Sequence, residues 1–224
     1  MEWQALEISF RLALLTSLLL LPVGIFLGRL LAWHTNRATP LLHSLIFLPL
    51  VLPPTVLGYY FLVMISGDAP LGQFWESLFG TSLAFSFEGL LLASLVANLP
   101  FAVQPIQHAF AAIDPEVRDA ARVCGLNPWL SLLKIELPLV WPGLVGAFLL
   151  TFTHTLGEFG VVLMVGGNLT GETRTLSIAI YDQVQAFNFD AAGQMALLLL
   201  ALAFFSLLLL QWLMLLRQRR NQNP

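Results

Sequence analysis

The chain has 224 residues, of which 58% are hydrophobic and only 10% are charged, and its formal net charge is −3 at pH 7. These values, with apolar runs longer than the ~20 residues of a membrane-spanning helix, exclude a water-soluble globular protein and indicate an all-α integral membrane protein with one domain, residues 1–224. The one cysteine, Cys124, cannot form an intrachain disulfide or a cysteine-based metal site, and we expect it to be a small packing residue.

Five apolar stretches are each about long enough to cross the ~30 Å hydrocarbon core of a bilayer. In chain order these predicted spans are Ile8–Trp33, Ser44–Ile65, Phe87–Ala111, Leu139–Val165 and Ala192–Leu216. Prolines interrupt the second span at Pro49, Pro53 and Pro54 and the third at Pro100 and Pro105. Because each proline removes one helix hydrogen bond, we expect kinks there, which either shape a gate or are static features of packing.

The distribution of basic residues predicts the orientation, because Lys and Arg near span ends are retained in the cytoplasm. They gather at the end of the first span or after it, between the third and fourth, and after the fifth: Arg29, Arg37, Arg118, Arg122, Lys134, Arg217, Arg219 and Arg220. The opposite segments, 68–88 and 172–190, are acidic with one basic residue, Arg174. We therefore expect the N-terminus outside, the C-terminus inside, and the basic tail, Arg217–Pro224, against the anionic inner leaflet.

The inner loop at about 114–138 has the local signals of two short helices joined by a sharp turn. Asp114 is a typical N-cap residue for the first helix, and Gly125 is typical of the position just after a helix end. Asn127 repeats the capping signal for a second helix, which we expect to run through Lys134 and end before Pro138.

Small side chains recur along one face of the first of these helices, at Val117, Ala120, Ala121 and Cys124. Two interpretations remain open from this pattern alone. The helix could rest on the membrane surface as an amphipathic helix. Alternatively, the helix pair docks into a groove on a soluble subunit and transmits the movement of that subunit to the spans.

The spacing of residues in this loop favours the second interpretation. The pattern consists of Asp119-Ala120-Ala121, Gly125, Ile135 and Leu137-Pro138. It resembles the "EAA" signature of ABC importer permeases, with Asp in place of the usual Glu. The resemblance implies that the loop is the coupling helix that contacts the ATP-binding subunit. It also implies that ATP–Mg is bound by that partner and that this chain has no catalytic residue, cofactor or metal.

Further segments resemble the molybdate permease subfamily, whose near relatives transport sulfate, thiosulfate and tungstate. They are Leu48–Tyr59, Leu156–Gly160, Gly171–Thr175 and Ala179–Tyr181. The resemblance implies a homodimer in the bacterial cytoplasmic (inner) membrane that binds two cytoplasmic ABC ATPase subunits. It further implies an extracytoplasmic molybdate-binding protein that delivers the oxyanion, whereas a sulfate or thiosulfate permease is the alternative.

The fourth span contains the candidate residues of a translocation path or gate. Thr151, His154, Thr155 and Glu158 are spaced by three and four residues, which predicts one polar helical face. Because a charged side chain in hydrocarbon is costly, Glu158 should avoid the lipid. Pore lining and a purely structural hydrogen-bonding role both remain open. We do not expect Glu158 to bind an oxyanion directly, since both are negative, but to orient His154 or a partner helix.

Other features leave alternatives open. The outer segment 166–190 could seat the binding protein or form a surface helix that caps the bundle. An ATP-independent channel or transporter is a further alternative, but the helix pair of the inner loop would have no function in such a protein. A membrane enzyme would need clustered ligands or acid and base groups, and the histidines are scattered along the chain at His34, His43, His108 and His154. The chain also carries no Gly-x4-Gly-Lys-Ser/Thr phosphate loop.

Overall fold

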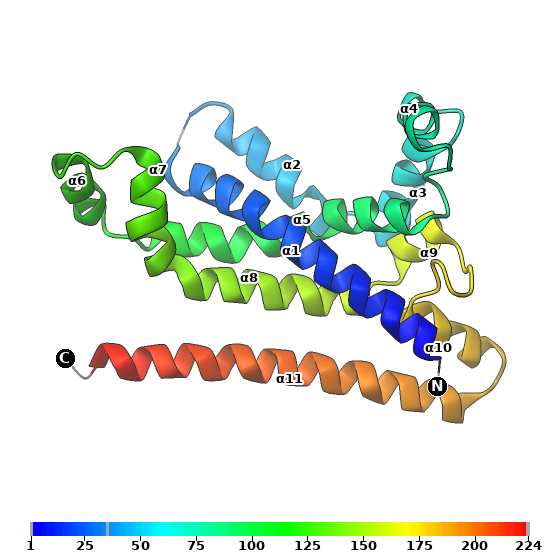
Figure 1. Ribbon diagram of the computed structural model, residues 1–224. Coiled ribbons are helices and arrows are strands. Elements are labelled where there is room, and N and C mark those ends of the chain that lie inside the picture. Colours follow the sequence, from blue (N-terminus) through cyan, green and yellow to red (C-terminus); the bar gives the residue numbers. More distant parts are fainter. Residues whose placement is uncertain (1, 35, 223–224) are drawn as a thin grey trace.

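The protein is an assembly of helices that run mostly parallel or antiparallel to one another (Figure 1). A computed structural model describes residues 2–34 and 36–222, with side chains described as far as residue 215, so that Arg217, Arg219 and Arg220 lie outside the described side chains. In chain order the elements are α1 (Trp3–Trp33), α2 (Thr39–Val51), α3 (Pro54–Ile65), α4 (Pro70–Phe79), α5 (Phe87–Ala111), α6 (Pro115–Val123), α7 (Pro128–Ser131), the π-helical turn η1 (Leu132–Glu136), α8 (Leu137–Gly157), α9 (Gly160–Gly166), α10 (Leu176–Gln185) and α11 (Phe189–Gln222).

Four stretches of the described chain are single helices long and apolar enough to cross a membrane: α1, α5, the continuous helix Pro128–Gly157 and residues 189–215 of α11. They confirm the first, third and fifth predicted spans as helices, whereas the fourth predicted span, Leu139–Val165, is one helix only as far as Gly157. A helix satisfies all of its backbone hydrogen bonds internally, which is why long apolar runs adopt this form in lipid. Which end of each helix faces the cytoplasm remains a prediction.

The second predicted span is not one helix. It consists of α2 and α3, which meet at an angle of 111°. The break falls at Leu52 and Pro53, whose ψ angles of 139° and 133° are extended, because a residue before proline is driven out of the helical region. Pro49 lies inside α2 without ending it, and the two prolines of the third span lie inside α5. The strong bend therefore requires the adjacent pair of prolines.

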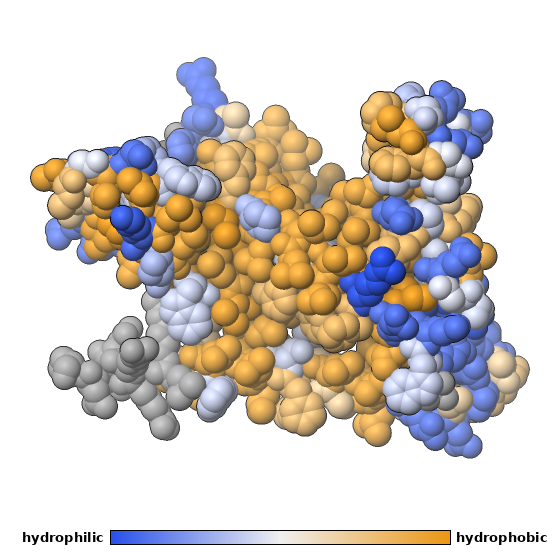
Figure 2. Space-filling model, viewed as in Figure 1, coloured by the Kyte–Doolittle hydropathy of each residue, from blue (hydrophilic) through white to orange (hydrophobic). Residues whose placement is uncertain are grey.

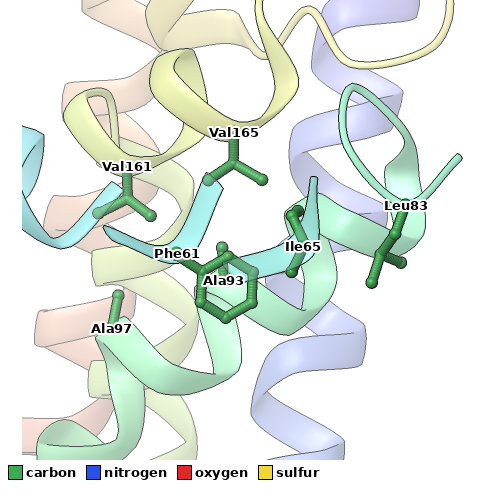
Figure 3. Packing of buried hydrophobic residues seen from close by; sticks show 7 residues of the cluster. All are labelled: Phe61, Ile65, Leu83, Ala93, Ala97, Val161 and Val165. Atoms are coloured by element: carbon green, nitrogen blue, oxygen red, sulfur yellow. The ribbon is translucent and has the colours of Figure 1, made fainter. Parts of the chain in front are cut away.

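Helices α1, α5 and α8 pack on one another along their length. Glycine permits the closest approach, since a Cβ on Gly28 would lie 2.9 Å from the backbone nitrogen of Gln107 in α5. A second cluster joins α3, α5 and α9, where Phe61, Ala93 and Val161 point toward one another (Figure 3). These contacts fix the bent pair and α9 against the main bundle.

Apolar residues cover the middle of the face seen in Figure 2, and hydrophilic residues gather toward the end that carries α10 and the N-terminus. Helix α11 runs beside α8 and α10, and most of its side chains as far as residue 215 are exposed. Helix α6 lies at the opposite end of the bundle (Figure 1). The end with α6 and the end with α10 therefore differ in the elements that form them, and each contains one of the candidate functional regions.

Candidate functional site

The first half of the predicted inner loop forms as expected. The Asp114 carboxylate accepts a hydrogen bond from the backbone N–H of Glu116 at 2.9 Å, which caps the N-terminus of α6. The chain turns after α6 at Gly125, whose φ of +76° is in the left-handed region that favours glycine. Both the cap and the stop of this helix are therefore confirmed, and α6 projects from the end of the bundle (Figure 1).

The second half of the loop differs from the prediction. The Asn127 carboxamide oxygen accepts from the Leu130 N–H at 2.8 Å, so this cap is confirmed. The helix does not end at Lys134, however, but continues through η1 into α8 as one helix, Pro128–Gly157. Pro138 lies in the first turn of α8, directly after the π turn, where the hydrogen-bond register changes from i→i+5 to i→i+4. We call residues 114–138, which comprise α6, the turn, α7 and η1, the elbow.

The motif residues of α6 divide between two environments. Asp119 and Arg122 form an exposed ion pair at 3.2 Å, with side chains about 70% exposed. Ala120 is also exposed, whereas Ala121 is buried, with 4% of its surface exposed. The expectation that Cys124 packs inside the protein is wrong: its side chain is exposed, because it follows the last residue of a projecting helix. Most of this surface is free to meet another protein.

The distal motif residues lie at the base of the elbow. Ile135 and Leu137 are half-buried, Leu137 packs against the core cluster of α5 and α8, and Pro138 is exposed. Between Ile135 and Leu137 is a residue to which the sequence assigned no role. Glu136 is 2% exposed, and its carboxylate accepts bonds from Arg29 Nε at 2.7 Å and Nη2 at 3.1 Å. The sequence signal for this role of Glu136 is Arg29, because a charged residue inside a predicted span needs a partner of opposite charge.

A second polar region lies where α8 ends. Glu158 is extended, with φ −68° and ψ 131°, and α9 begins at Gly160. The Asn98 Nδ2 of α5 donates to Glu158 Oε2 at 3.0 Å, and the Asn98 Oδ1 lies 2.9 Å from His154 Nδ1. Because a carboxamide oxygen only accepts, Nδ1 is the protonated nitrogen of the imidazole. The Phe101 ring stacks on this imidazole at 4.0 Å between centroids.

His154 and Glu158 line a cavity of about 270 Å³. Its other walls come from the bent pair, from α5 and from α9: Pro49, Leu50, Leu52, Pro54, Leu57, Ala97, Phe101 and Val161. The structure thus brings together two of the four candidate path residues and one residue, Asn98, that the prediction left out. The lining contains one carboxylate, one imidazole and no Lys or Arg.

The other two candidates lie elsewhere. Thr151 and Thr155 are 1% and 2% exposed, and Thr155 Oγ1 donates to the Thr151 carbonyl at 2.8 Å, inside the bundle. The predicted polar face does not reach Glu158, because the helix ends at Gly157. Signals for this end were present in Gly157 and Gly160, but the apolar run on both sides outweighed them.

The outer segment 166–190 contains the predicted helix, α10, which packs against α1, α8 and α11. Arg174 holds this segment in place: its Nη1 is 3.4 Å from Glu2, its Nη2 is 3.3 Å from Asp182, and its Nε donates to Asn168 at 2.6 Å. The ion pairs join the N-terminus of the chain to the two parts of the segment. This arrangement is compatible with a helix that caps the bundle and with a seat for another protein.

Known structures and relatives identify the class to which this fold belongs. A chain of a bacterial ABC transporter that imports the acidic polysaccharide alginate has the same fold, with a TM-score of 0.70 at 16% identity over 93% of this chain and 78% of that chain. Residues 21–222 match the family described as binding-protein-dependent transport system inner membrane component, and the chain belongs to this family. It is therefore a multi-pass subunit of a bacterial ABC importer in the inner membrane, in the family that supplies the membrane-spanning component.

Two relatives differ in what they transport. The molybdenum transport system permease protein ModB of Azotobacter vinelandii is 42% identical over 86% of this chain and 85% of its own length. The sulfate transport system permease protein CysT of Escherichia coli is 33% identical over 84% of this chain and 70% of its own length.

Proposed function

We propose that this chain is the permease subunit of a molybdate importer. The observation that carries the proposal is the 42% identity to a molybdenum permease over most of both chains, against 33% to a sulfate permease. Tungstate, an oxyanion of the same shape and charge, is included in this proposal. Sulfate or thiosulfate is the second candidate substrate, favoured by the likeness to the sulfate permease.

The proposed complex is a homodimer of this chain with two cytoplasmic ABC ATPase subunits and an extracytoplasmic molybdate-binding protein. ATP–Mg is bound and hydrolysed on the ATPase subunits, since this chain has no phosphate-loop motif. The exposed surface of α6, with Asp119 and Ala120, meets the ATPase subunit together with the following turn at Gly125. Closure of the two ATPase subunits moves the elbows and switches the spans from inward to outward access.

The oxyanion path includes the cavity at the end of α8. One copy of this cavity in each subunit would face the path in a homodimer. The Glu158 carboxylate does not bind the substrate, because two anions in a site of low dielectric repel each other strongly. Its role is instead to hold Asn98 and, through Asn98, the imidazole of His154 at the edge of the cavity. Thr151 and Thr155 support this region from inside the bundle.

Transport measurements test the substrate. The chain is reconstituted in proteoliposomes with its ATPase subunits and binding protein, and uptake of labelled molybdate is measured with excess sulfate or tungstate as competitor. We expect ATP-dependent uptake that tungstate inhibits and sulfate does not. Uptake that sulfate abolishes would assign the chain to sulfate transport.

The single exposed cysteine tests the docking surface without any added mutation. A photo-reactive crosslinker attached to Cys124 is expected to capture the ATPase subunit, and a Cys124→Ala variant treated in the same way serves as the control. If Cys124 captures no ATPase subunit while the purified chain alone conducts the oxyanion without ATP, the protein is a channel.

A further inference from the structure

One tryptophan lies where three helices meet. Trp33 is the last residue of α1, and its indole Nε1 donates to the carbonyl of Phe110, near the end of α5, at 3.1 Å. The two aromatic rings pack edge to face, with 5.3 Å between centroids. The Arg118 guanidinium of α6 lies 3.8 Å from the centroid of the same indole. Trp33 therefore contacts α5 and α6 from the end of α1.

Few other side chains of α6 connect this helix to the rest of the protein. Asp119 and Arg122 pair with each other on the exposed side of the helix. The buried Ala121 contributes only a methyl group. Among the hydrogen bonds, ion pairs and cation–π contacts of residues 2–34 and 36–215, the contact between Arg118 and Trp33 is the one that joins α6 to a membrane helix. Besides the short connection 112–114 to α5, a force on α6 thus reaches the bundle through the end of α1.

The other half of the elbow is attached to the same turn of α1. Glu136 of η1 accepts two hydrogen bonds from Arg29, and Ser131 Oγ donates to the same carboxylate at 3.0 Å. The Arg29 guanidinium also lies 4.8 Å from the Trp33 ring centroid. Both limbs of the elbow therefore converge on Arg29 and Trp33, which are one helical turn apart.

The charges in this cluster allow the two guanidinium groups to share one ring. Burial, and then the neighbouring Arg122, lower the pKa of Arg118, while Glu136 opposes this shift. Glu136 also neutralises Arg29 directly. The aromatic face attracts both cations, and the buried carboxylate reduces the repulsion between them.

We infer that Trp33 and Arg118 form the linkage that carries the movement of α6 to α1, and that the Arg29–Glu136 ion pair holds η1 to the same point, so that the elbow and the end of α1 move as one body. These four residues are positioning residues: they act through α1, which packs along α5 and α8. The inference rests on the proposed function, because it takes the ATPase subunits as the source of the movement.

The first test compares transport with ATP hydrolysis in the reconstituted transporter. Arg118→Ala and Trp33→Ala are expected to lower the number of oxyanions transported per ATP by roughly 2- to 30-fold, the range that corresponds to loss of a cation–π contact. Arg118→Lys and Trp33→Phe, which keep a cation and a ring, should remain near the wild-type ratio. Arg37→Ala removes an exposed arginine from the connection after α1 and is the matched control.

A wild-type ratio in both alanine variants would overturn the inference. If the wild-type chain binds no ATPase subunit or transports no oxyanion, the proposed function fails instead. If it transports sulfate in place of molybdate, the same ratios are measured with sulfate and the inference is tested unchanged.

A distance measurement between the ends of α6 and α1 tests the inference in variants that do not transport. Spin labels are placed on the natural Cys124 and on His34→Cys, both at exposed positions on either side of the linkage. Labelled chains are assembled with an excess of unlabelled Cys124→Ala chains, so that only distances within one subunit are measured. We expect one narrow distance distribution, the same with and without ATP, in the wild-type background. With Trp33→Ala the distribution should broaden or shift on ATP addition. A wild-type distance that already changes with ATP would show that α6 and α1 move separately.

Discussion

The carboxamide of Asn98 and the carboxylate of Glu158 are joined by a 3.0 Å hydrogen bond across the point where α8 ends. Glu158 is 8% exposed and Asn98 is fully buried. Since the other end of the carboxamide bonds to His154, one side chain of α5 holds both polar groups that α8 presents to the cavity. The geometry of the cavity therefore depends on a residue outside the span that carries its titratable groups.

Replacement of Asn98 tests this dependence. Asn98→Ala leaves Glu158 and His154 without their shared partner, and we expect a loss of about 1–3 kcal/mol in the free energy of unfolding, the cost of unsatisfied buried polar groups. Oxyanion uptake should fall as well. Thermal unfolding in detergent and uptake in proteoliposomes measure the two effects. Gln104→Ala, which removes an exposed carboxamide from the same helix, should change neither.

Two glycines of α8 provide a matched pair for the packing of α5 on α8. A Cβ on Gly143 would lie 2.5 Å from the Ala109 Cβ and 3.0 Å from the Pro105 carbonyl oxygen, whereas a Cβ on Gly146 would meet its nearest atom at 3.7 Å. Gly143→Ala should therefore destabilise the protein by about 1–3 kcal/mol, as overpacked cores do. Gly146→Ala should not. Equal melting temperatures for the two variants would contradict this description of the contact.

Two substitutions of Gly125 distinguish backbone strain at this position from a loss of docking to the ATPase subunit. A Cβ at this position meets nothing within 4 Å, so only its positive φ resists substitution. Gly125→Asn, which tolerates the left-handed region, should retain uptake. Gly125→Trp is expected to abolish uptake and copurification of the ATPase subunits while the chain still inserts in the membrane. Normal transport by the tryptophan variant would count against docking at the elbow.

Arg174 controls the outer segment. Arg174→Ala removes both ion pairs and the bond to Asn168, and because the side chain is 23% exposed, we expect a cost of only about 1 kcal/mol. Proteolysis within 166–175 should become faster, and stimulation of ATP hydrolysis by the binding protein should decrease if this segment is its seat. Glu172→Gln alters an exposed charge nearby and serves as the control. Unchanged stimulation would favour the capping role.

The local features of the elbow could be read from the sequence because each depends on a few adjacent residues. Asp114, Asn127 and Gly125 act on backbone groups within three residues of themselves, and all three predictions are confirmed. The Arg29–Glu136 pair joins residues 107 positions apart. No local pattern specifies that contact, because it exists only after α1 and η1 have packed.

The bend and the helix break were predicted incompletely for a different reason. Five prolines marked two spans for kinks, but within these spans a helix ends only at the pair Pro53 and Pro54, because two adjacent prolines exclude helical geometry at consecutive positions. At Glu158 the chain leaves the helix without a proline, and the carboxylate gains a partner from α5. Hydropathy detects neither event, since both occur within apolar sequence.

The π turn of η1 also sets the rotational phase of everything that follows it. Each residue of an α-helix advances the chain by roughly 100° around the axis. Insertion or deletion of a single amino acid within η1, before Glu136, would turn Glu136 and His154 together relative to α7, so that the elbow could not keep its place while Glu136 meets Arg29 and His154 meets Asn98. The length of this stretch, more than its composition, thus keeps the elbow in register with the cavity at the other end of α8.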